Sequence, residues 1–110
     1  MRDTISDVFA ALGDRTRREI YEQLLKDVNG WTATELAMTA TISRQAIVKH
    51  LQVLVRADLA STRRDGKEVR YYAQRDGALG ASRWLKERSV EWDRRLAMLE
   101  KRVRSSPRTP

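Results

Sequence analysis

The chain has 110 residues, enough for one domain with a modest core, and its 22 basic and 15 acidic residues give a formal net charge of +7. It has no cysteine and one histidine, which excludes disulfides, thiolate metal sites, a cysteine nucleophile and a multi-histidine zinc site. Because no apolar run approaches membrane-spanning length and the first residues lack the apolar segment of a signal peptide, we expect a cytoplasmic protein.

The first residues predict two helices in succession. Ile5, Val8, Phe9 and Leu12 have the spacing of one apolar stripe, which indicates a helix ending at Gly13. Asp14 is then placed to cap a second helix.

Residues 42–56 predict an amphipathic helix. At 100° per residue, one face collects Ala46, Ile47, His50, Leu51 and Leu54, and the other collects Gln45, Val48, Lys49, Gln52 and Arg56. Ser43 precedes the first turn and is a candidate N-cap, which places Arg44 and Gln45 in that turn. Taken alone, the pattern fits an ordinary surface helix with a solvated polar face equally well.

The neighbouring segments favour a more specific interpretation. Residues 32–37 predict a short helix with a capping box between Thr32 and Glu35. The link at 38–42 is too short for another element, so the two helices form a helix-turn-helix. Residues 59–73 then alternate as strands around Asp65-Gly66, which predicts a hairpin closed by a type I′ turn. The expected fold is therefore mainly α with a small hairpin: a winged helix-turn-helix of about five helices and a two-stranded wing.

The positive charge is concentrated on this predicted motif and at the end of the chain. From Ser43 to Tyr72 there are seven basic and three acidic residues, and the last ten residues carry four basic residues and no acid. Such clustering favours a polyanionic partner, most simply nucleic acid. Around the hairpin tip, Arg63, Arg64 and Lys67 are suited to phosphates or a narrowed minor groove. The alternative is that these charges only prevent edge pairing of the strands.

A long helix is predicted from about Gly77 to Arg104. Its apolar residues recur too few times for a convincing coiled coil, yet they leave apolar surface that a domain of this size cannot cover. A second copy of the chain is the expected cover, with the first helix as co-participant. The expected dimer interface consists of Ile5, Val8, Phe9, Leu85, Trp92, Leu96 and Leu99. Residues 1–104 are expected to form the DNA-binding domain with its dimerisation helices, and 105–110 a disordered basic tail.

Three segments together resemble the ArsR family of bacterial winged-helix repressors: 8–20 (VFAALGDRTRREI), 34–37 (TELA) and 42–54 (ISRQAIVKHLQVL), followed by the Asp-Gly hairpin. The resemblance implies a homodimer whose recognition helices enter successive major grooves of a pseudo-palindromic operator. It also implies DNA contacts from Ser43, Arg44, Gln45, Val48 and Lys49, to which the outer helix face adds Gln52.

The chain departs from the metal-sensing members of that family. Ala37 and Thr39 stand where those members have a Cys-x-Cys pair, and the last helix has no histidine, so we expect no metal sensing through the known sites. No catalytic triad, phosphate-binding glycine loop or metal cluster is evident, so we expect no enzyme, catalytic residue, metal or cofactor; an effector is not identified. The alternative function is sequence-tolerant, chromatin-like nucleic-acid binding.

Overall fold

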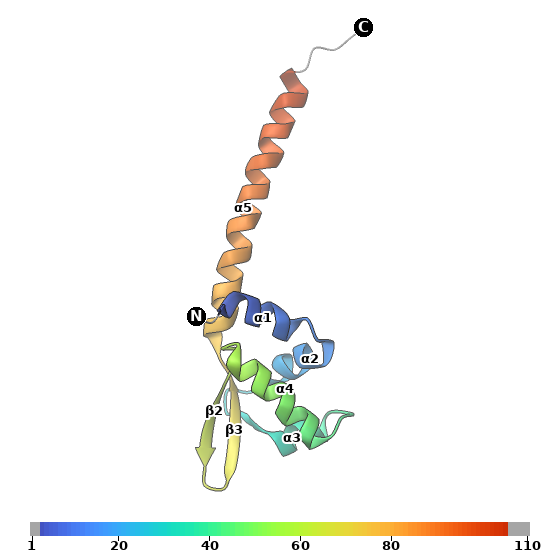
Figure 1. Ribbon diagram of the computed structural model, residues 1–110, viewed down its shortest axis with the longest axis vertical. Coiled ribbons are helices and arrows are strands. Elements are labelled where there is room, and N and C mark those ends of the chain that lie inside the picture. Colours follow the sequence, from blue (N-terminus) through green and yellow to red (C-terminus); the bar gives the residue numbers. More distant parts are fainter. Residues whose placement is uncertain (1–2, 106–110) are drawn as a thin grey trace.

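The structure is a computed structural model that describes residues 3–105. In this part of the chain it has five helices and three strands, in the order α1 (Thr4–Leu12), α2 (Arg15–Leu24), β1 (Trp31–Thr32), α3 (Ala33–Met38), α4 (Arg44–Arg56), β2 (Ala60–Asp65), β3 (Glu68–Ala73) and α5 (Arg75–Ser105). Figure 1 shows a compact group of elements with α5 running away from it and the β2–β3 hairpin extending the opposite way. The predicted winged helix-turn-helix is confirmed.

Polar side chains define where the first four helices begin. Asp3, Asp14, Thr32 and Ser43 each accept a hydrogen bond from a backbone N–H in the first turn of α1, α2, α3 and α4, respectively. Such bonds satisfy N–H groups that have no partner within the helix. At α3 the Thr32 N–H also donates to Glu35, which completes the predicted capping box. The starts of the helix-turn-helix therefore follow from local sequence.

The core is built around the inner face of α4. Ile47, Leu51 and Leu54 are fully buried, and they pack with side chains from the other elements of the compact region. Val8 of α1 is part of this cluster and has no exposed surface. The prediction that Val8 lies in a dimer interface is therefore wrong, because its side chain is buried in the core of its own chain and has no surface left to contact a partner.

The wing belongs to a three-stranded antiparallel sheet of order β1-β3-β2. The short strand β1 pairs Trp31 with Tyr71 and was not predicted, because two residues carry no alternation. The hairpin turn also differs from the prediction. Asp65 pairs with Glu68, so Gly66 and Lys67 are the central residues, and of these only Gly66 has a positive φ, 62°. That pattern is typical of a type II′ turn and not of the predicted type I′ turn.

The base of α5 is fixed to the compact region by a close backbone approach. The Gly77 N–H donates to the Asp58 carbonyl at 2.9 Å, and a Cβ at Gly77 would lie 2.2 Å from the Ala57 carbonyl oxygen. Only glycine permits that contact. Beyond Ala81 every described residue of α5 is exposed. The helix continues to Ser105, the first residue of the predicted tail; 106–110 lie outside the described residues.

The projecting helix dominates the dimensions of the molecule, which measures 77 × 31 × 25 Å along its principal axes. None of the helices in residues 3–105 is both long enough and apolar enough to cross a lipid bilayer.

Candidate nucleic-acid interface

The outer face of α4 carries the predicted recognition residues. Arg44, Gln45, Lys49 and Gln52 are exposed, while Val48 is half-buried against the core. Ser43 precedes them, and its Oγ accepts from the Ala46 N–H at 3.1 Å. The helix thus has one face in the core and a polar face with three positive charges open to solvent, those of Arg44, Lys49 and Arg56.

Arg44 has a specific partner in the other helix of the motif. Its Nε donates to the Thr34 Oγ1 at 3.1 Å, across the turn that separates α3 from α4. Both side chains line an open groove of about 600 Å³ between the helix-turn-helix and the hairpin. Val48 forms part of its floor, and Lys67, Glu68 and Val69 contribute from the hairpin. The groove joins the two structural parts that were predicted to contact DNA.

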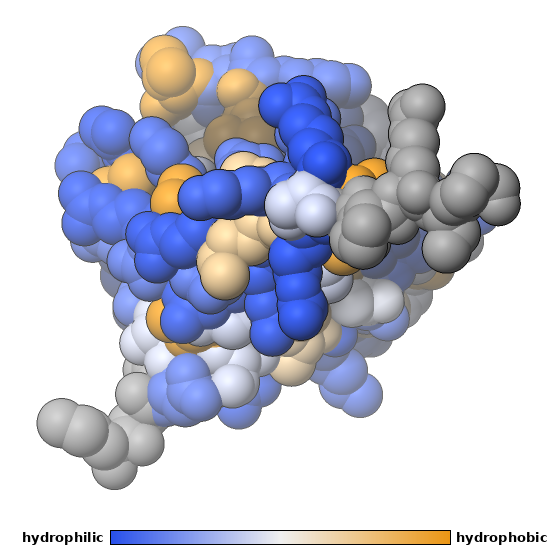
Figure 2. Space-filling model, turned by 90° about the horizontal axis from the view of Figure 1, so that it is seen from above, coloured by the Kyte–Doolittle hydropathy of each residue, from blue (hydrophilic) through white to orange (hydrophobic). Residues whose placement is uncertain are grey.

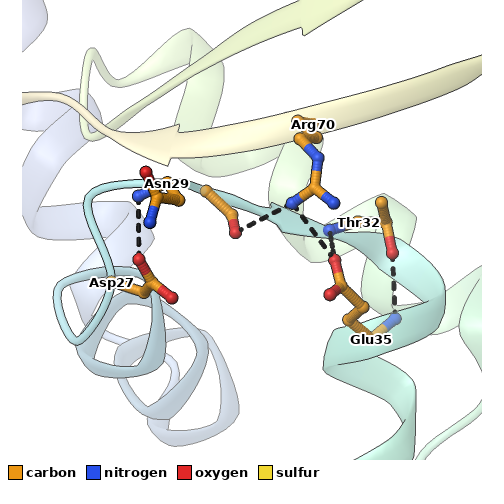
Figure 3. A network of polar contacts seen from close by, with 6 residues as sticks. Asp27, Asn29, Thr32, Glu35 and Arg70 are labelled. Carbon is orange, nitrogen blue, oxygen red and sulfur yellow. Dashed lines mark hydrogen bonds and ion pairs between the residues drawn. The ribbon is translucent and has the colours of Figure 1, made fainter. Parts of the chain in front are cut away.

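A polar network connects β3 to α3 beside this groove (Figure 3). An Nη atom of Arg70 lies 3.4 Å from a Glu35 carboxylate oxygen and donates to the Gly30 carbonyl at 3.2 Å. The hydrogen bond from the Thr32 backbone N–H is the largest contribution that lowers the pKa of the Glu35 carboxyl, and the Thr32 hydroxyl and the positive charge of Arg70 lower it further. Arg70 thereby holds the hairpin against the first helix of the motif.

The three wing cations do not form one cluster. Arg63 is opposite Arg70 in the sheet and its guanidinium lies 5.4 Å from the centre of the Tyr72 ring, a cation–π contact. Arg64 is opposite Val69 and therefore projects from the other face of the hairpin. Arg64 and Lys67 are exposed and make no ion pair within residues 3–105. They are the wing cations that remain available to an external anion.

The opposite end of the molecule presents apolar side chains. Trp92, Leu96 and Leu99 of α5 are 61%, 56% and 57% exposed. Seen from above, hydrophobic residues show between hydrophilic ones on the surface (Figure 2). Near the base of α5, the rings of Phe9 and Trp84 meet edge to face at 5.7 Å, which connects α1 to α5. Ile5 is half-buried and Leu85 exposed.

Two contributors to this interface were not predicted from sequence. Thr34 belongs to the predicted short helix and to the family segment 34–37, but neither gives its side chain a role, and Arg70 is one of the seven basic residues of 43–72. Their partners lie 10 and up to 40 residues away, beyond the reach of local periodicity. In the described part of the chain, no group of three or more histidine, aspartate or glutamate side chains is arranged to hold a metal ion.

The fold and the exposed basic face of α4 define a winged helix-turn-helix of the DNA-binding class. A family model described as a helix-turn-helix domain matches residues 12–63. The chain is 44% identical over 66 residues to the uncharacterised HTH-type transcriptional regulator YuzN of Bacillus subtilis, covering 54% of this chain and 71% of that protein. It is 37% identical over 67 residues to the transcriptional repressor SdpR of the same species, covering 61% and 72%.

The solved structures include an ArsR-like transcriptional regulator from Rhodococcus sp. RHA1, with 38% sequence identity, a TM-score of 0.85 and coverage of 94% of each chain. That similarity extends over α5 as well as the compact region. The chain therefore belongs to the ArsR family of winged helix-turn-helix transcriptional regulators.

Proposed function

We propose that the protein is a homodimeric, sequence-specific repressor that binds a pseudo-palindromic operator. The observation that carries this proposal is the division of α4: Ile47, Leu51 and Leu54 anchor one face in the core, and the opposite face offers Arg44 and Gln45 to a partner. A helix so anchored is a rigid support for side chains that contact base edges in the major groove. The similarity to the repressor SdpR favours repression over activation.

The residue types suit different parts of the DNA. Arg44 is able to pair bidentately with guanine O6 and N7, and Gln45 with adenine N6 and N7. Val48 offers methyl groups to a thymine methyl. Ser43, Lys49 and Gln52 are proposed to contact phosphate or sugar, which fixes the register of the helix without conveying sequence.

The wing is proposed to lie on the flanking backbone. Arg64 and Lys67 contribute exposed positive charge there, and neutralising a phosphate releases counterions, so each contact strengthens binding to any sequence. Arg63 contributes less, because moving it to a phosphate requires giving up its contact with Tyr72.

Dimerisation is proposed through α5, with α1 beside it. Leu85, Trp92, Leu96 and Leu99 are all more than half exposed, although apolar side chains of this size are stabilised by leaving water. A second copy offers the same surface by two-fold symmetry. Ile5 and the 40%-exposed Phe9 extend this surface onto α1.

The test is selection of genomic DNA fragments by the purified protein at about 150 mM salt, followed by sequencing of the bound fragments. We expect two related half-sites centred about one helical turn, 10–10.5 base pairs, apart. The matched control is the Arg44→Ala, Gln45→Ala double variant, which should enrich no such motif. Abundant binding without any motif in the wild-type protein would instead support the sequence-tolerant alternative, and no binding would contradict both.

A further inference from the structure

The bond between Arg44 and Thr34 has a consequence for base recognition. Thr34 is the second residue of α3 and is exposed, and its hydroxyl accepts a hydrogen bond from the Arg44 Nε. Arg44 makes no ion pair within the described residues, so this bond is its only specific polar contact there. The two side chains come from the two helices of the motif and meet in the groove that opens toward the hairpin.

The geometry of the guanidinium makes this contact directional. The group is planar and has five N–H donors, one on Nε and two on each Nη. Because the Nε–H donates to Thr34, the N–H groups of both terminal nitrogens remain available to a ligand. The hydrogen bond from Nε also restrains the plane in which the terminal nitrogens lie. Two terminal nitrogens in a fixed plane match the paired O6 and N7 acceptors of guanine.

We infer that Thr34 is a positioning residue for base readout: its hydroxyl orients Arg44 so that the two terminal nitrogens meet a guanine end-on. This inference rests on the proposed function, in which Arg44 contacts a base. An arginine side chain loses rotamer freedom when it binds, and part of that loss has already occurred in the free protein when Thr34 holds it. The hydroxyl therefore favours the correct base without touching it.

The test is a competition assay that compares the selected operator with the same operator carrying adenine in place of the contacted guanine. Thr34→Val has the shape of threonine without the acceptor, and should lower the preference for guanine by about 3- to 10-fold, the range of one net hydrogen bond. Thr34→Ser keeps the acceptor and should retain the preference. Thr41→Val is the matched control, because Thr41 is an exposed threonine beside α4 with no hydrogen bond in residues 3–105.

Four further measurements separate positioning from damage to the fold. The melting temperature and the salt dependence of nonspecific binding should be the same for Thr34→Val and wild type. Thr34→Ala, a better helix former, should lose the preference to the same extent. In an Arg44→Ala background, Thr34→Val should have no further effect on base preference.

The outcomes distinguish a failure of the role inferred for Thr34 from a failure of the proposed contact between Arg44 and a base. If Arg44→Ala relaxes the preference for guanine and Thr34→Val does not, Thr34 does not position Arg44, and the base contact stands. Equal losses in Thr34→Ser and Thr34→Val would also overturn the inference, because Thr34→Ser keeps the hydroxyl acceptor and the loss could not then come from removing it. If Arg44→Ala leaves every base preference unchanged, the proposed base contact fails and the inference fails with it.

Discussion

The two ends of this molecule are stabilised in opposite ways. In the compact region, α4 and its neighbours bury seven large side chains completely, and each helix start there is satisfied by a cap. In α5, a helix of 31 residues, only Gly77 and Ala81 are buried, and no residue beyond Ala81 is. The compact region is therefore stabilised by contacts within a single chain. Beyond Ala81, α5 carries an apolar surface that no other described residue buries, and this is the surface at which dimerisation is proposed.

The largest expected effect comes from placing a charge on the apolar surface of α5. Leu96→Asp should abolish dimerisation, because a carboxylate would have to be buried at the interface. A monomer can engage only one half-site, so operator affinity should fall by about 10²- to 10⁴-fold. Light scattering after size-exclusion chromatography and a DNA titration measure the two effects.

Met98→Asp is the matched control for this variant. Met98 is 63% exposed, similar to Leu96 at 56%, and two residues along a helix place it on nearly the opposite side. It should remain dimeric and keep its operator affinity. A Leu96→Asp protein that stays dimeric at the same concentration would contradict the proposed interface.

A core substitution should have the next largest effect, and on a different property. Leu51 is fully buried, so Leu51→Ala should lower the free energy of unfolding by about 2–5 kcal/mol through lost contacts and a cavity. That loss should persist in the monomeric Leu96→Asp background, as urea denaturation would show. Leu96→Ala should instead change the melting temperature in a way that depends on protein concentration. Concentration-independent destabilisation by Leu96→Ala would mean that α5 is stabilised within one chain.

The sequence-based predictions succeeded for features that are encoded locally. Three of these signals each involve a few neighbouring residues, and the structure has an element at each place: the periodicity of 42–56, the capping residues Ser43 and Thr32, and the Asp-Gly pair. The predicted turn type was wrong because the register of the strands, and not the Asp65-Gly66 dipeptide, decides which two residues are central in the turn. Residue types alone do not determine that register.

Features that depend on distant partners were not predictable in this way. The stripe on α1 has side chains for two purposes: Val8 enters the core and Phe9 stays 40% exposed against Trp84. Periodicity identifies the stripe but not which of its members a later helix will cover. Similarly, Arg63 and Arg64 are neighbours in sequence with the same charge, and only strand pairing shows that they project from opposite faces.

Removal of Arg44 should have an intermediate effect, confined to DNA binding. Arg44→Ala is expected to weaken operator binding by about 1–3 kcal/mol and to relax the preference at one base pair of each half-site. Unfolding should change little, because the side chain is exposed. Lys26→Ala, which removes an exposed cation outside α4 and the hairpin, is the control and should preserve the selected motif. An unchanged motif in the Arg44→Ala protein would remove this residue from base recognition.

The wing variants should have a smaller effect that is independent of sequence. Arg64→Ala and Lys67→Ala should each weaken binding to all duplexes and reduce the slope of log affinity against log salt by about 1.8, because each variant removes one phosphate contact, worth about 0.9, from each of the two subunits. Arg63→Ala should change the slope less, because its guanidinium is engaged with Tyr72. Equal slopes for wild type and the Arg64 and Lys67 variants would place the wing away from the backbone.

The smallest expected effect is a change in acid sensitivity where α3 meets the wing. The folded protein lowers the pKa of Glu35 from its ordinary value of 4.5, chiefly through the Thr32 backbone N–H, with a further contribution from Arg70. A depressed folded pKa means that the unfolded chain takes up its proton first as the pH falls. The stabilisation by Glu35 is therefore complete above about pH 4.5 and is lost as the pH falls through the lower, folded value.

Glu35→Gln keeps a capping side chain but not the charge. Its unfolding free energy should consequently fall less steeply between about pH 5 and pH 3 than that of wild type. Glu22→Gln, an exposed change on α2, should follow the wild-type curve. A Glu35→Gln protein that also follows it would show that the folded protein does not stabilise the Glu35 carboxylate relative to the unfolded chain.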